Sequence, residues 1–270
     1  DKLLLRTKNS YPVVYKGNGS TSGSTNYQYH TYDSYKELRN NGFKKKGYTF
    51  VEWNTKSNGS GTSYKSGQSV TNLISKSSHQ KTLYAIWRLS NYSITYHLDG
   101  GKNNPDNPSK YTIKDSVDFK DPTKDGYTFA GWYLDEALTK PASYIDEGSC
   151  GKLDLYAAWT VGQYTVKFMG NGGQTSDGYT SYKQTFKFDQ KKKLTANRFL
   201  REGYTFKYFT SKSDGSGIIY NDKASVKNLT NKVGATVKLY ANYTPINYHI
   251  SYVLNGGNNH DDNPTAYTIE

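Results

Sequence analysis

The chain repeats itself at a fixed distance of 156 residues, and this internal repeat constrains its fold more than any other feature. The stretch around Tyr48 reads Gly-Tyr-Thr-Phe, and the same four residues recur around Tyr204. Further anchors keep the same spacing: Leu38 and Leu194, Phe43 and Phe199, Trp53 and Phe209, Tyr84 and Tyr240, Trp87 and Tyr243. A fixed period of this kind indicates a tandem array of similar folding units.

A shorter unit lies between these two copies. It carries the same closing motifs, Gly126-Tyr127-Thr128-Phe129 and Leu155-Tyr156-Ala157-Ala158-Trp159. Its own opening residues recur 156 positions later, where Tyr92 corresponds to Tyr248. The period is therefore a pair of different units, which we name type A and type B.

The boundaries between units follow the closing aromatic motifs. Repeat one is type A and spans 11–88, repeat two is type B and spans 89–160, and repeat three is type A and spans 161–244. Residues 245–270 begin a fourth repeat of type B, and residues 1–10 read as the remnant of a preceding unit or a linker. We expect the chain to be a piece of a longer protein.

Each repeat reads as β-structure. Tyr92–Leu98 alternates in polarity and then stops at Asp99-Gly100-Gly101, which is typical of a strand followed by a tight turn. Tyr164–Phe168 behaves in the same way. Helical periodicity is confined to two short candidates, Ser34–Asn40 and Ser225–Thr230. The sequence predicts a mainly β protein, α+β at most, made of small domains with at most one short helix or 3₁₀ turn each.

The linkers between repeats are short. Four residues separate Trp87 from Tyr92, and the other two junctions have the same length. Linkers of this length do not let neighbouring domains fold back freely on one another. We therefore expect an extended array, a semi-rigid monomeric rod of β-rich domains.

The charge balance does not by itself indicate a nucleic-acid partner. The net charge is +12, with 35 Lys and Arg against 23 Asp and Glu, but the basic residues are mostly scattered lysines. The runs Lys44-Lys45-Lys46 and Lys191-Lys192-Lys193 each precede a Gly-Tyr-Thr-Phe motif. We interpret them as solvated loops or charged sheet edges, with a polyanion-binding patch as the alternative. We expect no nucleic-acid partner.

No catalytic or metal-binding constellation is evident in the sequence. Cys150 is the single cysteine, so the chain has no disulfide framework and no thiolate metal cluster. None of the five histidines recurs at the 156-residue offset; His97, for example, maps to Val253. There is also no nucleophile elbow, no phosphate-binding loop, no signal peptide and no apolar run of membrane-spanning length. We expect no enzyme activity, no cofactor, no metal and no membrane insertion.

Repeat two carries the most specific motifs. It opens with Tyr92–Gly101, continues with Pro122–Tyr133 and closes with Leu155–Trp159. These motifs resemble the internalin B-repeat family, also called the Listeria–Bacteroides repeat, and the resemblance covers nearly the whole chain. It implies a β-grasp-like, ubiquitin-like fold for each repeat. It also implies tandem arrays in secreted or wall-anchored bacterial proteins, where such repeats act as spacers or adhesive modules.

The four tryptophans are candidate sugar-stacking residues. They are Trp53, Trp87, Trp132 and Trp159. Their fixed places beside shared motifs favour core positions instead, and burial of such a ring stabilises a small domain by about 2–3 kcal/mol. Repeat three replaces them by other aromatic residues, as packing requires and as an indole-specific ligand site would not allow.

The tyrosine-rich segment of repeat one lies where the two type A repeats diverge most. Its candidate ligand-binding residues are Tyr27, Tyr29, Tyr32 and Tyr35. Tyrosine is enriched in binding surfaces because it offers rigid area and a polar tip. The alternative is a strand with one tyrosine face buried. Repeat three has Tyr179 and Tyr182 in the corresponding stretch.

We expect a non-catalytic repeat region of a bacterial cell-surface protein, extracellular and either wall-attached or secreted. It would act as an extended stalk or spacer with an adhesive role. The alternative is a ligand-binding module that recognises a host protein, such as an immunoglobulin or matrix protein, or a glycan through tyrosine-rich surfaces. Any such binding should be sought where the repeat fails, between Gly19 and Leu38 and between Gly172 and Leu194.

Overall fold

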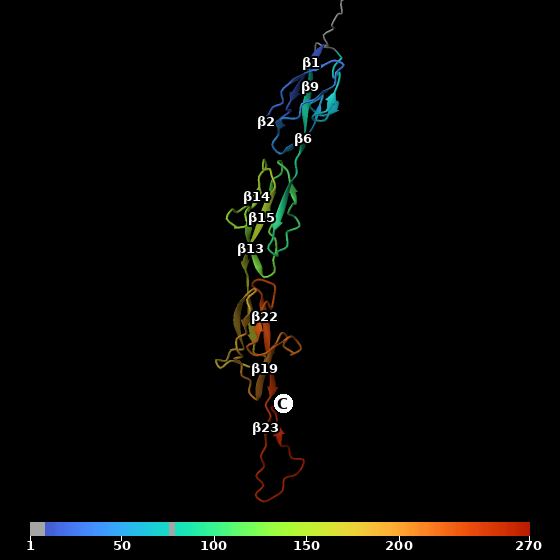
Figure 1. Cartoon of the computed structure of the whole chain (residues 1–270). Helices are drawn as coiled ribbons and strands as arrows, with labels where there is room; N and C mark the ends of the chain where they lie inside the picture. Colours follow the sequence, from blue (N-terminus) through green and yellow to red (C-terminus); the bar gives the residue numbers. More distant parts are fainter. Residues whose placement is uncertain (1–8, 76–78) are drawn as a thin grey trace, which may run out of the picture. The chain divides into compact units, whose positions relative to one another are not determined.

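The computed structural model describes residues 9–75 and 79–270 (Figure 1). These residues form strands and turns and contain no helix, so the chain is mainly β, as the alternating patterns predict. Residues 1–8 of the predicted N-terminal remnant lie outside the described part. The β-grasp assignment that the family resemblance implies stays a prediction.

The described residues divide into two compact units, and the division passes through repeat two. Of the described residues, the first unit comprises 9–75, 79–97, Pro105–Lys120 and Trp132–Tyr156, and the second comprises Leu98–Asn104, Asp121–Gly131 and Ala157–Glu270. Repeat one and its junction with repeat two therefore lie in the first unit. Repeat three and its junction with repeat two lie in the second.

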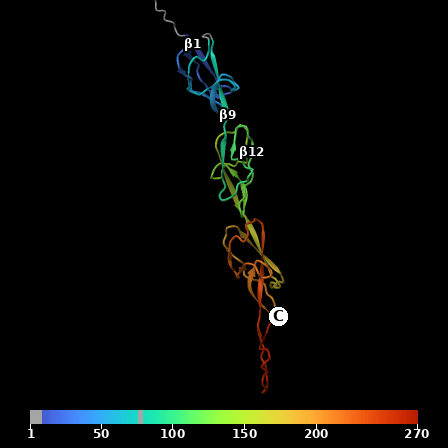
Figure 2. The same ribbon diagram turned by 90° about the vertical axis from the view of Figure 1, so that its right-hand side faces the viewer.

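Repeat one is built on a five-stranded sheet. Its strands are β1 (Ser10–Lys16), β2 (Ser22–Gly23), β3 (Gln28–Thr31), β4 (Lys36–Glu37), β5 (Phe43–Lys44), β6 (Tyr48–Asn54), β7 (Ser63–Tyr64), β8 (Ser69–Val70) and β9 (Lys81–Leu89). The sheet order is β3-β1-β9-β6-β7, and β2-β5 and β4-β8 form two small sheets. The first and last strands, β1 and β9, both labelled in Figure 2, are parallel neighbours in the sheet, and β9 pairs with β6 antiparallel.

Repeat two follows the same plan with fewer residues. Its strands are β10 (Tyr92–His97), β11 (Lys110–Tyr111), β12 (Val117–Asp118), β13 (Tyr127–Tyr133), β14 (Tyr144–Ile145) and β15 (Leu153–Val161). The main sheet has the order β11-β10-β15-β13, and β12 pairs with β14. β10 runs parallel to β15, as β1 runs parallel to β9.

Repeat three returns to the five-stranded plan. Its strands are β16 (Gln163–Met169), β17 (Ser181–Lys187), β18 (Lys192–Lys193), β19 (Tyr204–Thr210), β20 (Ile219–Tyr220), β21 (Ser225–Val226) and β22 (Thr236–Pro245). The sheet order is β17-β16-β22-β19-β20, and β18 pairs with β21. The partial fourth repeat contributes β23 (Tyr248–His249) and β24 (Ala266–Tyr267), which pair antiparallel.

The first strand of each repeat explains why the cores are aromatic. In β16, Tyr164, Val166 and Phe168 are buried and alternate with more exposed neighbours, because side chains alternate across a strand. β1 shows the same pattern. β16 ends at Met169 and is followed by a turn at Asn171 and Gly172, whose φ angles are +48° and +97°. This confirms the predicted turn, since asparagine and glycine tolerate positive φ.

The prediction of two short helical segments is wrong. Ser34–Asn40 contains β4, which pairs with β8, and Ser225–Thr230 begins with β21, which pairs with β18. Helices this short are marginal because nucleation is unfavourable. The backbone groups form hydrogen bonds across small two-stranded sheets instead.

The tryptophans take part in core packing, which confirms that interpretation. Trp53 and Trp132 are buried, and Phe209, the equivalent of Trp53 in repeat three, has no exposed area. Phe50 packs edge-on against Trp53, with ring centroids 5.1 Å apart. The indole ring is therefore one of several aromatic groups that fill this position.

The other two tryptophans are half-buried and tie the last strand to the turn after the first strand. Trp87 Nε1 donates to the carbonyl oxygen of Gly17 at 2.8 Å. Trp159 Nε1 donates to the carbonyl oxygen of Leu98 at 3.0 Å. Each bond joins the two ends of one repeat.

Candidate functional site

The tyrosine-rich segment of repeat one is arranged by the pairing of β3 with β1. His30 lies opposite Tyr11, and Tyr29 lies opposite Pro12. Because side chains alternate along a strand, His30 points into the core and Tyr29 points to solvent. The exposed fraction is 0% for His30 and 55% for Tyr29. Tyr27, two residues earlier, is 58% exposed.

Tyr27 and Tyr29 are the predicted site residues that the structure brings together. Their rings meet edge to face, with centroids 5.7 Å apart. Lys36 Nζ donates to the carbonyl oxygen of Tyr29 at 2.8 Å and so fixes the backbone beneath them. Tyr35 is 78% exposed. The three side chains present rings and hydroxyl groups to solvent, as tyrosines of binding surfaces do.

Tyr32 does not share this exposed surface. Its ring packs against that of Tyr11, with centroids 5.2 Å apart. Its hydroxyl group is buried and has no hydrogen-bond partner among the described residues. Burial raises the pKa of Tyr32, and the neighbouring Tyr11 adds to the shift. The structure thus separates Tyr32 from the other three predicted residues.

His30 is a buried titratable residue beneath this surface, and it is not one of the site residues predicted from the sequence. Its Nε2 atom lies 2.6 Å from the side-chain nitrogen Nε2 of Gln28, and its ring stacks on Tyr11. Nδ1 has no hydrogen-bond partner within residues 9–75 and 79–270. Burial lowers the pKa of His30, and the charge of Lys36 lowers it further. The available signal was the 156-residue offset, which maps His30 onto Phe186.

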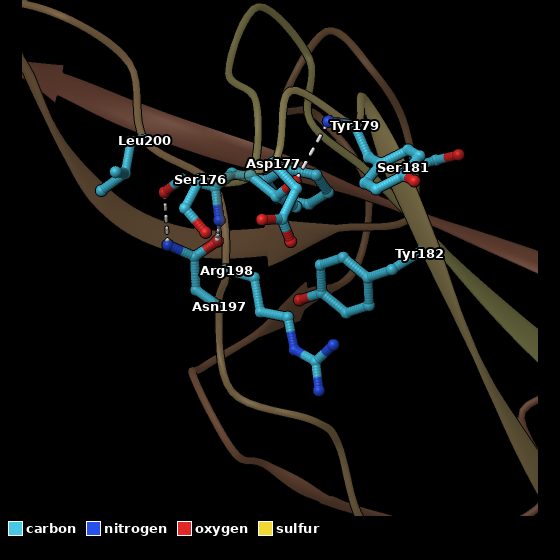
Figure 3. A pocket seen from close by; sticks show the side chains of 10 residues that line it. Ser176, Asp177, Tyr179, Ser181, Tyr182, Asn197, Arg198 and Leu200 are labelled. Carbon is cyan, nitrogen blue, oxygen red and sulfur yellow. Dashed lines mark hydrogen bonds between the residues drawn. The ribbon is translucent and has the colours of Figure 1, made fainter.

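Repeat three has a surface pocket of about 600 Å³ (Figure 3). Residues of 175–182 line one side and residues 197–200 line the other. A pair of backbone hydrogen bonds between Gln174 and Leu200 joins the two sides. The side chains of Tyr179 and Leu200 are 67% and 72% exposed and form an apolar rim.

Tyr182 and Arg198 provide the inner part of this pocket. Tyr182 Oη donates to the carbonyl oxygen of Ala196 at 3.1 Å, and burial raises the pKa of Tyr182. The guanidinium carbon of Arg198 lies 5.3 Å from the centre of the Tyr182 ring, where the ring attracts a cation (Figure 3). Asp177 is an exposed carboxylate at the rim. Asp177 is the one carboxylate of the lining, which contains no histidine and no cysteine.

The sequence did not place this pocket, and it misaligned the tyrosines of repeat three. The strand register makes Lys183 and Thr185 the counterparts of Tyr27 and Tyr29. Tyr182 lies opposite the buried Phe168 and belongs to the core edge. Repeat three has three more residues between Gly172 and Leu194 than repeat one has between Gly19 and Leu38. This insertion was the usable signal, because insertions at a hairpin create new surface.

The described part of the chain shows no metal centre and no membrane helix. Among residues 9–75 and 79–270, no group of three or more His, Cys, Asp and Glu side chains is placed to hold a metal ion. No helix there is long and apolar enough to cross a membrane. Cys150 is exposed.

All three repeats match one known protein family. The model of the Listeria-Bacteroides repeat domain matches residues 11–86, 92–158 and 164–242. The chain belongs to the Listeria–Bacteroides repeat family. Each match falls within one of repeats one, two and three, and the matches confirm the resemblance that the Gly-Tyr-Thr-Phe and closing aromatic motifs indicate.

Three similar proteins are each much longer than this chain. A protein of Evansella cellulosilytica provisionally named Gly-rich membrane protein is 30% identical over 217 residues, covering 79% of this chain and 23% of the relative. A second, provisionally named membrane protein from that organism is 30% identical over 143 residues, 52% and 21% of the two chains. Internalin H of Listeria monocytogenes is 30% identical over 118 residues, 43% and 20%. The chain spans about a fifth of the length of these curated relatives.

Proposed function

We propose that these Listeria–Bacteroides repeats form a non-catalytic spacer in a bacterial cell-envelope protein. The observation that carries the proposal is the repetition of one β-rich core with almost no chain between copies. β9 ends at Leu89 and β10 begins at Tyr92, while β15 ends at Val161 and β16 begins at Gln163. One or two residues per junction leave little slack, so the array resists folding back on itself.

The relatives support the location. Two are named membrane proteins and the third is an internalin. We place this chain outside the cell, in a protein that is wall-attached or secreted, with the repeats projecting other domains away from the surface. Like other repeat arrays, such a spacer gains length by adding units without a new core.

Small-angle X-ray scattering of the full chain tests the spacer. A compact globule of 270 residues would have a radius of gyration of about 18 Å. We expect a radius of gyration well above this value and a scattering profile typical of an elongated chain of separate domains. A radius near the compact value would contradict the spacer function.

The exposed tyrosines of repeat one and the pocket of repeat three favour a second function, adhesion to a host protein or glycan. Both surfaces lie in stretches that differ between the two type A repeats, where the core does not fix the sequence. Surface plasmon resonance against purified immunoglobulin, matrix proteins and a glycan panel tests it. We expect binding tighter than ~0.1 mM that is lost in a Tyr27→Ser, Tyr29→Ser variant or in Tyr179→Ser. Equal binding by the parent and both variants, or none by the parent, would contradict adhesion.

A further inference from the structure

The glycine of each Gly-Tyr-Thr-Phe motif lies where one repeat passes into the next. The carbonyl oxygen of Gly126 accepts a hydrogen bond from the amide of Gly162 at 2.9 Å. The same bond joins Gly47 to the amide of Ser90 at 3.0 Å. Gly162 and Ser90 are linker residues, so the pairing of the last strand continues into the linker. Each linker is thereby fixed to the repeat that precedes it.

Repeat three comes close to Gly126 within the second unit. Gly126 has a φ of +78°, and a Cβ atom there would clash with the ring of Phe188. The ring of Tyr127 meets Phe188 edge to face, with centroids 5.9 Å apart. Glycine is therefore required here both by the backbone conformation and by the approach of Phe188.

Polar contacts surround this packing. Tyr127 Oη donates to Oδ2 of Asp189 at 2.8 Å, and the amide of Gly126 donates to the carbonyl oxygen of Asn231 at 2.9 Å. Asn231 Nδ2 donates in turn to Asp125 Oδ2 at 3.2 Å. Three successive residues of repeat two thus make directional bonds to repeat three.

Asp189 is oriented by its own repeat. Its φ is +59°, its amide donates to Asn228 Oδ1 at 2.7 Å, and its Oδ1 accepts from Asn228 Nδ2 at 2.9 Å. Lys227 Nζ lies 3.1 Å from the same oxygen. Hydrogen bonds from Asn228, Tyr127 and Lys227, in that order, lower the pKa of Asp189 to about 2. The acceptor of the Tyr127 hydroxyl is therefore charged at neutral pH, which strengthens the bond.

Repeat one has the equivalent pair of residues, Tyr32 and Asp33. We call this pair, which is Phe188 and Asp189 in repeat three, the corner of a type A repeat. Asp33 has a φ of +56°, its amide donates to Asn72 Oδ1 at 2.8 Å, and Asn72 Nδ2 donates to Asp33 Oδ1 at 3.0 Å. Tyr32 precedes Asp33 as Phe188 precedes Asp189. In the described part of the chain, no tyrosine hydroxyl donates to Asp33. The corner thus forms without that contact and is a built-in feature of type A repeats.

The type B repeat presents a different corner to the repeat before it. Its residue at the Phe188 position is Ile113, and a Cβ on Gly47 would come within 2.5 Å of the Cβ of Ile113. The next residue is Lys114 instead of an aspartate. Tyr48 Oη has no hydrogen-bond partner among the described residues. This junction shares the close approach to glycine but lacks the tyrosine–aspartate bond.

The start of the fourth repeat, which is also type B, makes the same kind of apolar contact as Ile113 makes with Gly47. Ile269 approaches Gly203, where a Cβ would come within 2.7 Å of Ile269 Cδ1. Tyr204 Oη donates to Glu270 Oε1 at 3.1 Å. This carboxylate belongs to a longer side chain, whereas the type A aspartate is fixed by its asparagine partner.

We propose that the corner of a type A repeat is an interaction surface for the Gly-Tyr turn of a type B repeat. The Tyr127–Asp189 bond then holds repeats two and three together as one rigid body, and we call this connection the joint. The inference rests on the proposed spacer function and deepens it, because such a joint determines the stiffness of the spacer. It also gives the alternation of repeat types a chemical reason. The type A corner combines an aromatic ring with an aspartate held in position, and the type B corners do not.

Spin-label distance measurements on the full chain test the joint. Cys150 is a native, exposed labelling position in repeat two, and Lys183→Cys adds a second on the exposed face of β17. We expect a narrow distance distribution in this labelled parent. Tyr127→Phe removes the hydroxyl donor and Asp189→Ala removes the carboxylate acceptor. Each should broaden the distribution at least twofold, because each removes the bond and keeps the ring at position 127 against Phe188. The double variant should be no broader than the singles, since all three lose the same bond.

Tyr48→Phe is the matched control, because Tyr48 lacks an aspartate partner, and it should leave the distribution unchanged. Circular dichroism verifies that every variant stays folded. Equal widths in the parent and in Tyr127→Phe would overturn the joint, as would a broad parent. A broad parent with a large radius of gyration would overturn the joint alone. A compact radius of gyration would overturn the spacer function itself.

Discussion

Repeat one closes on a tryptophan and repeat three closes on a tyrosine, yet the two side chains make the same bond. Trp87 Nε1 donates to the carbonyl oxygen of Gly17 at 2.8 Å, and Tyr243 Oη donates to that of Gly170 at 2.8 Å. The position requires a large ring with a donor at its far end, and an indole is one way to supply it. Comparison of the two type A repeats thus separates what the fold requires from what each copy adds.

The first hairpin shows what each copy adds. The β1–β3 pairing covers four residue pairs, whereas the β16–β17 pairing covers seven. Beside Tyr11 repeat one has the polar His30, and beside Tyr164 repeat three has Phe186, with rings stacked at 5.4 Å. The longer hairpin of repeat three borders a pocket, and the shorter one of repeat one displays tyrosines. Variation in this hairpin changes the surface while the core keeps its plan.

Truncation of the central aromatic residue should damage both repeats equally. Trp53 and Phe209 have no exposed area, so we expect Trp53→Ala and Phe209→Ala each to cost about 3–5 kcal/mol in the unfolding free energy of its own repeat. Hydrogen exchange read by mass spectrometry resolves the repeats. Tryptophan fluorescence should miss the Phe209→Ala transition, because repeat three contains no tryptophan. If one of the two variants lost less than about 1 kcal/mol of unfolding free energy, Trp53 and Phe209 would not be equivalent in packing.

Removal of the closing donor should have a smaller effect. Tyr243→Phe deletes one hydrogen bond and should cost about 1 kcal/mol, measured by urea unfolding. In repeat one, Trp87→Tyr should cost less than Trp87→Phe, because a tyrosine hydroxyl reaches the equivalent carbonyl in repeat three. Equal costs for the two Trp87 variants would show that the ring alone matters.

His30 should make repeat one more sensitive to acid than repeat three. Burial lowers its folded-state pKa below the ordinary 6.5, and Lys36 is the charged group that adds to the shift, while Gln28 and Tyr11 are neutral neighbours. The unfolded chain therefore binds a proton at higher pH than the folded one. Stability from the neutral imidazole is full above about 6.5 and is lost as the pH falls from there towards the folded pKa. Urea unfolding between pH 8 and pH 5 should show this loss, and His30→Phe should remove it.

The exposed tyrosines should matter least for folding. Tyr27→Ser, Tyr29→Ser and Tyr35→Ser should each change the unfolding free energy by no more than about 0.5 kcal/mol. Tyr32→Ser should destabilise more than these, because its ring packs on Tyr11. Thermal unfolding of the four variants gives the ranking, and an equal effect of all four would contradict the separation of Tyr32 from the others.

The sequence predicted the parts of the structure that depend on local pattern or on exact repetition. Trp53 and Phe209 are 156 residues apart, so their common role in packing could be inferred from the repeat. The turn at Asn171 could be predicted because its signal is local. The joint depends on Tyr127 and Asp189, which are 62 residues apart and belong to different repeat types. No periodicity relates such a pair. The pocket likewise arises from an insertion whose path depends on the hairpin around it.

The first and last strands of each repeat lie side by side and point the same way. In repeat three, Thr165 pairs with Thr236 and Met169 pairs with Tyr240. A pulling force enters at the start of β16 and leaves at the end of β22, so it slides the two strands past each other along their length. Their hydrogen bonds then bear the load together instead of opening one at a time from an end. Because forced unfolding is governed by the unfolding rate, this geometry favours a tether that holds under tension.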